Sequence, residues 1–88
     1  MLQQYGVLPY YLDGDGQLHI LLITSRGTGR WVIPRGNAMP ALPPHQAAAQ
    51  EAFEEAGLTG IVGPEEIGSY RYLKRRKRSP DEPAEVHI

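Results

Sequence analysis

The sequence predicts a small α/β domain in which short β-strands precede and follow a single helix. Residues 5–12 and 17–24 are rich in β-branched and aromatic side chains, and the turn sequence DGDG of residues 13–16 joins them, as is typical of a β-hairpin. Residues 43–57 are dominated by alanine and glutamate, which favour a helix. Residues 66–75 alternate in the manner of a strand. This order of elements is typical of the α/β class.

Proline and glycine mark the ends of these elements. Pro34 cannot donate a backbone hydrogen bond, so we expect it to end a third short strand over residues 30–34. The two prolines that open the helix are tolerated in a first helical turn, and Gly57 stands where a helix commonly ends. Residues 79–83 predict a turn, and residues 84–88 predict another strand.

Length and composition exclude several classes of protein. The 88 residues allow one small domain and no two-domain enzyme, because compact domains usually have about 100–150 residues. A composition of 41% hydrophobic and 22% charged residues is globular, and no apolar run approaches the roughly 20 residues that a membrane span needs. Cysteine is absent, which excludes disulfides and a thiol nucleophile. The first residues lack the features of a secretion signal, so we expect a cytoplasmic location.

Basic residues are concentrated near the end of the chain, although the formal net charge is only -1. Six of the nine lysine and arginine residues lie within eight positions. Solvation at a hairpin tip is the favoured interpretation of this cluster. The alternatives are a surface that binds a highly phosphorylated substrate, for which Lys74 and Arg76 are the candidate contacts, and a nucleic-acid tether. Nucleic acid is not the expected partner. The cluster consists of Arg71, Lys74, Arg75, Arg76, Lys77 and Arg78.

The predicted helix carries three carboxylates on one face. Glu51, Glu54 and Glu55 are spaced at i, i+3 and i+4, so they lie within one turn of each other. On spacing alone, a solvated acidic face is the simpler interpretation. The alanines around them, however, form a nearly all-small surface that lets the helix lie close to a sheet or loop. Carboxylates held in this way can bind a hard divalent cation such as Mg²⁺ together with phosphate oxygens.

The stretch from Gly36 to Leu58 resembles the signature of the Nudix hydrolases. The spacing fits without a gap, and the segment Trp31–Gly36 is similar to the entry of that signature. Two positions depart from it: Leu42 replaces the first signature glutamate, and Gln50 replaces the signature arginine, which is understood in the family to orient the glutamates. The stretch also looks like a bacterial branch that resembles the diphosphoinositol-polyphosphate phosphohydrolases. The matching residues are Gly36, Glu51, Glu54, Glu55, Gly57 and Leu58.

The resemblance implies a particular fold, and it implies that the domain is incomplete. The fold is an α/β/α sandwich around a mixed β-sheet, in which residues 36–58 form a loop–helix–loop within a single domain of residues 1–88. Domains of this family are longer, so we expect this one to be truncated. Residues 84–88 are then an inner strand with an unpaired edge, and the chain either lacks its C-terminal part or completes its sheet with a partner copy as a homodimer.

The resemblance also implies a reaction and roles for its residues. The reaction is Mg²⁺-dependent hydrolysis, with Mn²⁺ as an alternative cation, of a pyrophosphate bond by water attack on phosphorus. The substrate is a small phosphorylated molecule: a nucleoside diphosphate derivative, a dinucleoside polyphosphate or a diphosphoinositol polyphosphate. Glu51 and Glu55 are the implied metal ligands, together with a backbone carbonyl at Gly36, and Glu54 is the implied base or third ligand. The roles of Glu54 and Glu55 could be exchanged.

Other residues near the signature have two interpretations each. Arg35 either contacts substrate phosphate, which a guanidinium binds with two hydrogen bonds, or is a solvated loop charge. We expect Trp31 to be a core residue rather than a platform for a base. Gln50 favours a second function, a catalytically weakened module that binds a phosphorylated ligand without hydrolysing it. The three intact glutamates favour the enzyme.

Overall fold

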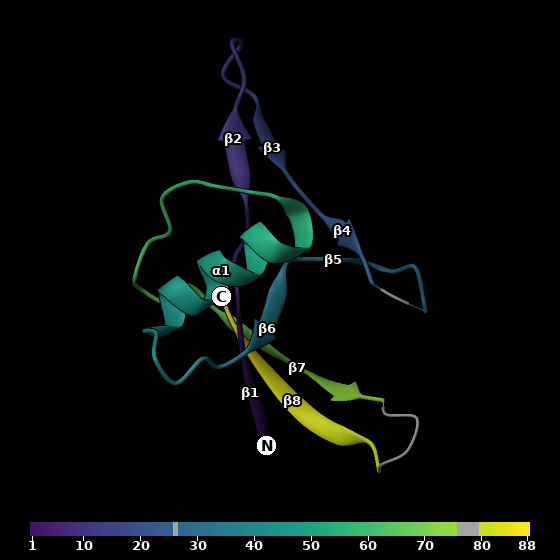
Figure 1. Ribbon diagram of the computed structural model, residues 1–88. Helices are drawn as coiled ribbons and strands as arrows, with labels where there is room; N and C mark the ends of the chain where they lie inside the picture. Colours follow the sequence, from purple (N-terminus) through teal and green to yellow (C-terminus); the bar gives the residue numbers. More distant parts are fainter. Residues whose placement is uncertain (26, 76–79) are drawn as a thin grey trace.

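The computed structural model describes residues 1–25, 27–75 and 80–88 of the chain (Figure 1). Arg76, one of the expected substrate contacts, lies outside the described residues. The described elements, in chain order, are β1 (Leu2–Gly6), β2 (Tyr10–Leu12), β3 (Leu18–Ile20), β4 (Ile23–Thr24), β5 (Trp31–Val32), β6 (Arg35–Asn37), α1 (Pro44–Ala56), β7 (Ser69–Lys74) and β8 (Glu82–His87).

The main sheet has four strands in the order β6-β1-β8-β7. β1 pairs antiparallel with β6 and parallel with β8, and β8 pairs antiparallel with β7, so the sheet is mixed. The helix α1 packs against β1 and β6, at one edge of this sheet (Figure 1). The α/β class and the mixed sheet are therefore confirmed. Within the described residues α1 is the single helix, and it forms one helical layer.

The last strand is paired along both of its edges. Val86 of β8 has Gln4 of β1 on one side and Tyr70 of β7 on the other. The expectation of an inner strand is confirmed, but the expected unpaired edge is wrong, because β1 supplies the missing neighbour. The strand also begins earlier than expected, at Glu82, so part of the predicted turn is extended. A partner copy that completes the sheet stays a prediction.

The N-terminal segment forms two strands rather than the single strand expected over residues 5–12. The break lies at residues 7–9, where Pro9 has no backbone N–H to donate, and its carbonyl accepts a hydrogen bond from the Leu21 amide at 3.0 Å. The predicted hairpin is present as β2 and β3, which pair from Tyr10 with Ile20 to Leu12 with Leu18. β1 is thereby released to join the main sheet.

The third predicted strand is shorter than expected, and a strand that the sequence did not reveal follows it. β5 ends at Val32 and pairs with β4 in a separate two-stranded sheet. Beyond Pro34 the chain turns into β6, which pairs with β1. Trp31 is 71% exposed, so its expected place in the core is wrong. It lies in the small β4–β5 hairpin rather than in the main sheet.

The helix is held by small residues on its inner face and by glycine at its end. Ala47, Ala48 and Ala52 are buried against the sheet, which allows a close approach of the two backbones. Gly57 adopts φ +67°, and its N–H donates to the Phe53 carbonyl at 2.9 Å. This left-handed conformation is unstrained only for glycine. α1 has 13 residues, and no helix of the described residues is long and apolar enough to cross a membrane.

Replacement of Gly57 by alanine is predicted to lower the free energy of unfolding by about 1 kcal/mol, because a Cβ strains the left-handed conformation. Urea denaturation measures this change. Gly60→Ala is the matched control, since Gly60 has an ordinary φ and open space around it. Equal stability of the two variants contradicts this account of the helix end.

Candidate active site

Glu51 is the carboxylate that the fold places most tightly. Its carboxyl group lies directly over Gly36 of β6, so closely that a Cβ at position 36 would overlap with it, with Oε2 only 2.5 Å from the Cβ position. Any residue other than glycine there would force the carboxyl group away. The glycine and the glutamate of the signature are therefore a matched pair, and α1 and β6 bring them together.

Glu55, one turn further along α1, contacts the same strand, β6. Its Oε2 accepts a hydrogen bond from the backbone N–H of Arg35 at 3.1 Å. Glu51 and Glu55 are thus both directed at residues 35 and 36, as the helical spacing predicts. Two carboxylates and the backbone of residues 35 and 36 therefore lie together at the edge of the main sheet.

Glu54 has a different partner. Its Oε1 accepts a hydrogen bond from the Gln50 side-chain amide at 3.1 Å. Gln50 stands at the position of the signature arginine, and it keeps a contact with a glutamate while it brings no charge. The amide orients one oxygen of Glu54 but does not offset its negative charge.

The surroundings of Glu51 and Glu55 disfavour the ionised form of both carboxyl groups. Partial burial raises the pKa of the Glu51 carboxyl, and the nearby charges of Glu55 and Glu54 raise it further. Burial likewise raises the pKa of Glu55, although the hydrogen bond and the positive charge of Arg35 oppose this shift. Burial, together with repulsion from a neighbouring glutamate, therefore makes ionisation of Glu51 and Glu55 less favourable than in free solution.

A cleft of about 560 Å³ brings the expected site residues together. Arg35 and the three glutamates line it, and so does Lys74 from the end of β7. Among the described members of the basic cluster, Lys74 is the one that lines this cleft. The structure thus gathers the expected residues from β6, α1 and β7.

The cleft also contains residues that the sequence did not single out. The Arg35 guanidinium lies over the ring of Tyr72, with Cζ 4.7 Å from the ring centroid. The Tyr72 hydroxyl donates to Oε1 of Gln4 at 2.7 Å, and Nε2 of Gln4 donates to Oδ1 of Asn37 at 3.1 Å. No local motif marks these residues, because they come from β1, β6 and β7. Alternation along residues 66–75 could have placed Tyr72 on one face of a strand, but not against Arg35.

The donor set of this site suits a hard divalent cation. Carboxylate oxygens are ligands that Mg²⁺ prefers in proteins, and Glu51 and Glu55 converge on residues 35 and 36 of β6. Across residues 1–25, 27–75 and 80–88, no group of three acidic, histidine or cysteine side chains is already arranged around one point as metal ligands. Two converging carboxylates therefore fit Mg²⁺, although the described residues hold no preformed all-carboxylate cage.

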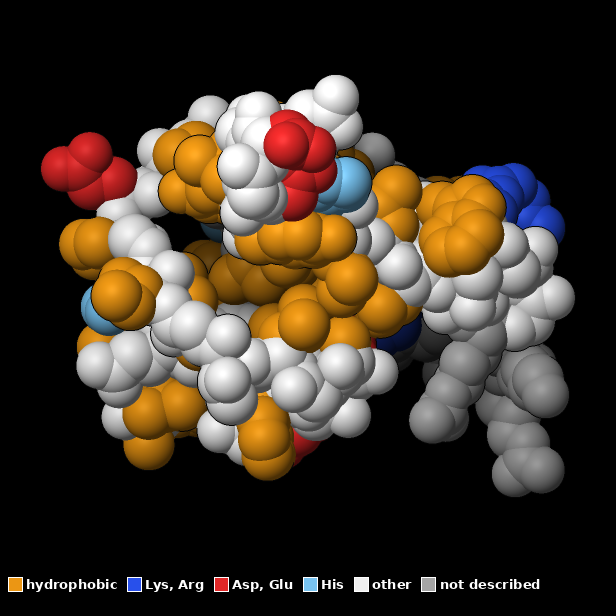
Figure 2. All heavy atoms as spheres, turned by 90° about the horizontal axis from the view of Figure 1, so that it is seen from above, with side chains coloured by type: hydrophobic (Ala, Val, Ile, Leu, Met, Phe, Trp, Pro, Cys, Tyr) orange, Lys and Arg blue, Asp and Glu red, His pale blue; other side chains and the backbone are white. Residues whose placement is uncertain are grey.

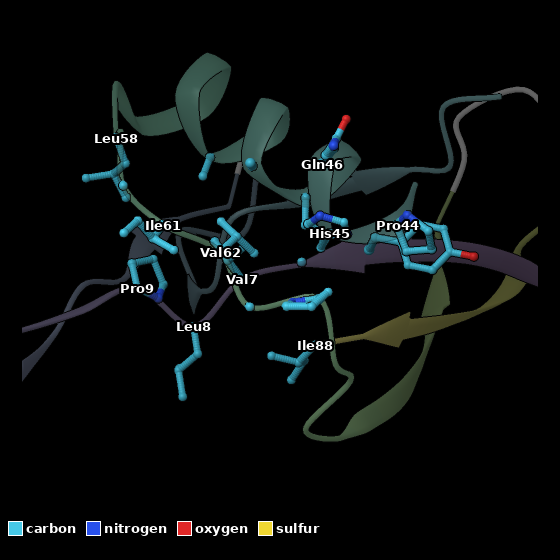
Figure 3. A pocket seen from close by; sticks show the side chains of 18 of the residues that line it. Val7, Leu8, Pro9, Pro44, His45, Gln46, Leu58, Ile61, Val62 and Ile88 are labelled. Carbon is cyan, nitrogen blue, oxygen red and sulfur yellow. The ribbon is translucent and has the colours of Figure 1, made fainter. Parts of the chain in front are cut away.

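A larger, mostly apolar hollow of about 1340 Å³ lies on another face of α1. It is lined by residues of α1, by residues 58–67 and by residues near Val7, Leu8 and Pro9 (Figure 3). In Figure 2, hydrophobic side chains gather around a hollow on the face seen from above. None of the signature glutamates lines this larger hollow. We therefore place the candidate site in the smaller cleft, which the three glutamates line.

The fold and the site together define an α/β domain with an acidic cleft between a helix and the edge of a mixed sheet. A sequence model of the NUDIX domain matches residues 3–88. The chain therefore belongs to the Nudix family, which confirms the resemblance.

Two curated relatives show how much of a longer protein this chain covers. Diphosphoinositol polyphosphate phosphohydrolase 3-beta of Bos taurus is 38% identical over 58 residues, which is 66% of this chain and 35% of the bovine protein. Nudix hydrolase 21, chloroplastic, of Arabidopsis thaliana is 32% identical over 77 residues, which is 84% of this chain and 38% of the plant protein. The chain thus spans about a third of the length of these relatives.

The fold is also that of a solved structure. A crystal structure of a C. elegans Ap4A hydrolase matches with a TM-score of 0.65 at 20% sequence identity. The match covers 98% of this chain and 64% of the nematode chain. At this identity the likeness shows the fold alone.

Glu51→Gln is predicted to raise the melting temperature of the metal-free protein at pH 7. The pKa of Glu51 is raised by folding, so its contribution to stability is complete below the ordinary carboxyl value and is lost as pH rises through the raised value. Glutamine removes this loss, and the difference between the two proteins should vanish near pH 4.

Melting curves in EDTA at pH 4 and pH 7 measure the effect. Glu65→Gln, at an exposed position outside the cleft, is the control and should leave the difference between the two pH values unchanged. A lower melting temperature for Glu51→Gln at pH 7 contradicts the prediction.

Proposed function

We propose that this chain is the catalytic part of a Mg²⁺-dependent Nudix pyrophosphohydrolase. The observation that carries the proposal is the convergence of Glu51 and Glu55 on residues 35 and 36, with Glu54 and Arg35 in the same cleft. A negative cluster beside a positive side chain suits a substrate that carries phosphate and arrives with a divalent cation. The membership of the Nudix family supports the same reaction class.

Glu51 and Glu55 are the residues that hold the cation, together with the Gly36 carbonyl. Mg²⁺, or Mn²⁺ in its place, supplies positive charge beside the phosphate oxygens when bound. Each of the two glutamates is oriented by β6. Glu51 packs against the backbone of Gly36, and Glu55 accepts a hydrogen bond from the Arg35 amide. Burial is the main cause of their raised pKa values, and a nearby glutamate charge adds to it in each case.

We assign Glu54 as the general base. Its Oε1 is engaged by Gln50, and its second oxygen, Oε2, takes a proton from the water that attacks phosphorus. The bond from phosphorus to the bridging oxygen breaks, and the leaving phosphate departs with that oxygen. A glutamate in this role contributes a factor of about 10²–10⁴ to the rate. An exchange of roles between Glu54 and Glu55 is the alternative assignment.

Arg35 and Lys74 are the proposed substrate contacts. Both line the cleft, and a guanidinium binds phosphate oxygens with a planar pair of donors. The relatives named diphosphoinositol polyphosphate phosphohydrolase support a polyphosphate as the substrate. A small phosphorylated molecule of this type is therefore the proposed substrate class, and the expected contact of Arg76 remains part of the proposal.

One observation favours a second candidate function. Gln50 meets Glu54 through a neutral amide instead of a guanidinium, so the charge that the signature arginine supplies is missing. A domain of the same fold that binds a phosphorylated ligand without turnover would retain Arg35 and Lys74 while it tolerates this loss. The enzyme remains the better supported candidate, because all three glutamates are in place.

Hydrolysis assays with Mg²⁺ distinguish the two candidates. Diphosphoinositol, diadenosine-polyphosphate and nucleoside-diphosphate-sugar substrates form the panel, and phosphate release is the readout. We expect Glu54→Gln and Glu55→Gln each to lose about 100-fold or more in kcat, whereas Glu65→Gln stays at wild-type activity. Full activity in both cleft variants contradicts the assignment, and binding without turnover by the wild type supports the module.

Gly36→Ala is predicted to lower activity by about 100-fold, because the new Cβ displaces the Glu51 carboxyl group from its seat. Gly63→Ala is the control, since no atom lies near its Cβ position. Steady-state kinetics with the best substrate of the panel measures both. Wild-type activity in Gly36→Ala shows that the close approach is dispensable.

A further inference from the structure

The side chain of Arg35 crosses the sheet instead of extending freely into solvent. Arg35 lies on β6 and Tyr72 on β7, the two edge strands of the main sheet. Three strand spacings separate these edges, about 14 Å, yet the guanidinium lies 4.7 Å from the Tyr72 ring centroid. Both long side chains therefore reach toward each other over β1 and β8.

Tyr72 is held in place by contacts that do not involve Arg35. Its cross-strand partner on β8 is Ala84, which is fully buried and small. Its hydroxyl is held by Gln4, whose side chain is buried with the residue only 5% exposed, and Gln4 is held in turn by Asn37. This chain of hydrogen bonds spans the sheet from β7 to β6, so the ring has a defined place beside the cleft.

The contact leaves the guanidinium ready to bind an anion. An arginine stacked on an aromatic ring uses its face for the ring and keeps the N–H donors at its edge for a ligand. Tyr70, the neighbour on the same face of β7, also lies near Arg35, whose positive charge opposes the rise of the Tyr70 pKa that burial causes. A long side chain ordered in advance loses less entropy when phosphate binds. The ring also keeps the guanidinium in the cleft that the glutamates line.

We propose that Tyr72 is a positioning residue that holds the Arg35 guanidinium in place for a pyrophosphate group of the substrate. The proposal rests on the proposed function, in which Arg35 contacts phosphate. Tyr72 itself does not contact the reacting atoms. It acts through Arg35, and its removal should matter only while Arg35 is present.

A double-mutant cycle tests this dependence. The probe is methylenediphosphonate, a pyrophosphate analogue that is not hydrolysed, and its affinity is measured by calorimetry at fixed Mg²⁺ concentration. We expect Tyr72→Leu to weaken binding about fivefold and Arg35→Ala to weaken it further. Tyr72→Leu should have no added effect in the Arg35→Ala background.

Conservative and distant variants separate positioning from general structural damage. Tyr72→Phe and Tyr72→Trp keep a ring under the guanidinium and should bind within twofold of wild type, although Tyr72→Phe melts at a lower temperature because Gln4 loses its donor. Tyr10→Leu, at a tyrosine of the β2–β3 hairpin that is 69% exposed, is the matched control and should bind as wild type. In hydrolysis assays Tyr72→Leu should raise KM about fivefold with kcat within twofold.

Several outcomes overturn the proposal. Equal losses from Tyr72→Leu with and without Arg35, unchanged affinity in Tyr72→Leu, or no binding of the analogue by the wild type each do so. If Tyr72→Leu does not fold, NMR spectra of the wild-type protein provide the test. The Arg35 δ protons should show an upfield ring-current shift, and ordinary chemical shifts contradict the contact between the guanidinium and the Tyr72 ring. Binding of the analogue without hydrolysis of any substrate overturns the proposed enzyme, while the cycle still decides the role of Tyr72.

Discussion

The close approach of α1 to β6 is the constraint on which the rest of the site depends. Glu51 can occupy its place only because position 36 has no side chain, and the helix can come so near only because its inner face consists of alanines. From this one contact follow the position of Glu55 at the Arg35 amide and the cleft in front of both. The small residues of β6 and of the inner face of α1 therefore leave the space that the Glu51 carboxyl group occupies.

The sequence predicted the helix and the acidic site well, because both depend on local spacing. Glu51, Glu54 and Glu55 share a face in any helix, and a long signature places Gly36 at a known distance from them. The strands were predicted less well. The break at Pro9 includes a hydrogen bond with Leu21, and the short strand β6 depends on pairing with β1. Pairing partners far apart in the chain leave little trace in local composition.

The residues that lie around Arg35 were missed for the same reason. Gln4 and Tyr72 carry no signature, and their contact joins β1 to β7, which are not neighbours in a sheet whose strand order does not follow the chain. Trp31 shows the opposite error, since its apolar side chain suggested burial although its strand stands apart from the main sheet. Side-chain type and spacing predicted that the signature glutamates share one face, whereas side-chain type alone gave no reliable guide to position elsewhere.

The parallel pairing of β1 with β8 has a consequence for the order of folding. These strands lie near opposite ends of the described chain and are neighbours in the sheet, so their contact closes a very long loop. Contacts of this kind form late and slow the folding of small domains. The helix can form early from local interactions, but the surface on which Tyr72 and Gln4 meet exists only after β8 has entered between β1 and β7. Acidic groups are thus in place on the helix before the partner of the cationic group is, and assembly of the cleft is tied to the slowest step of chain closure.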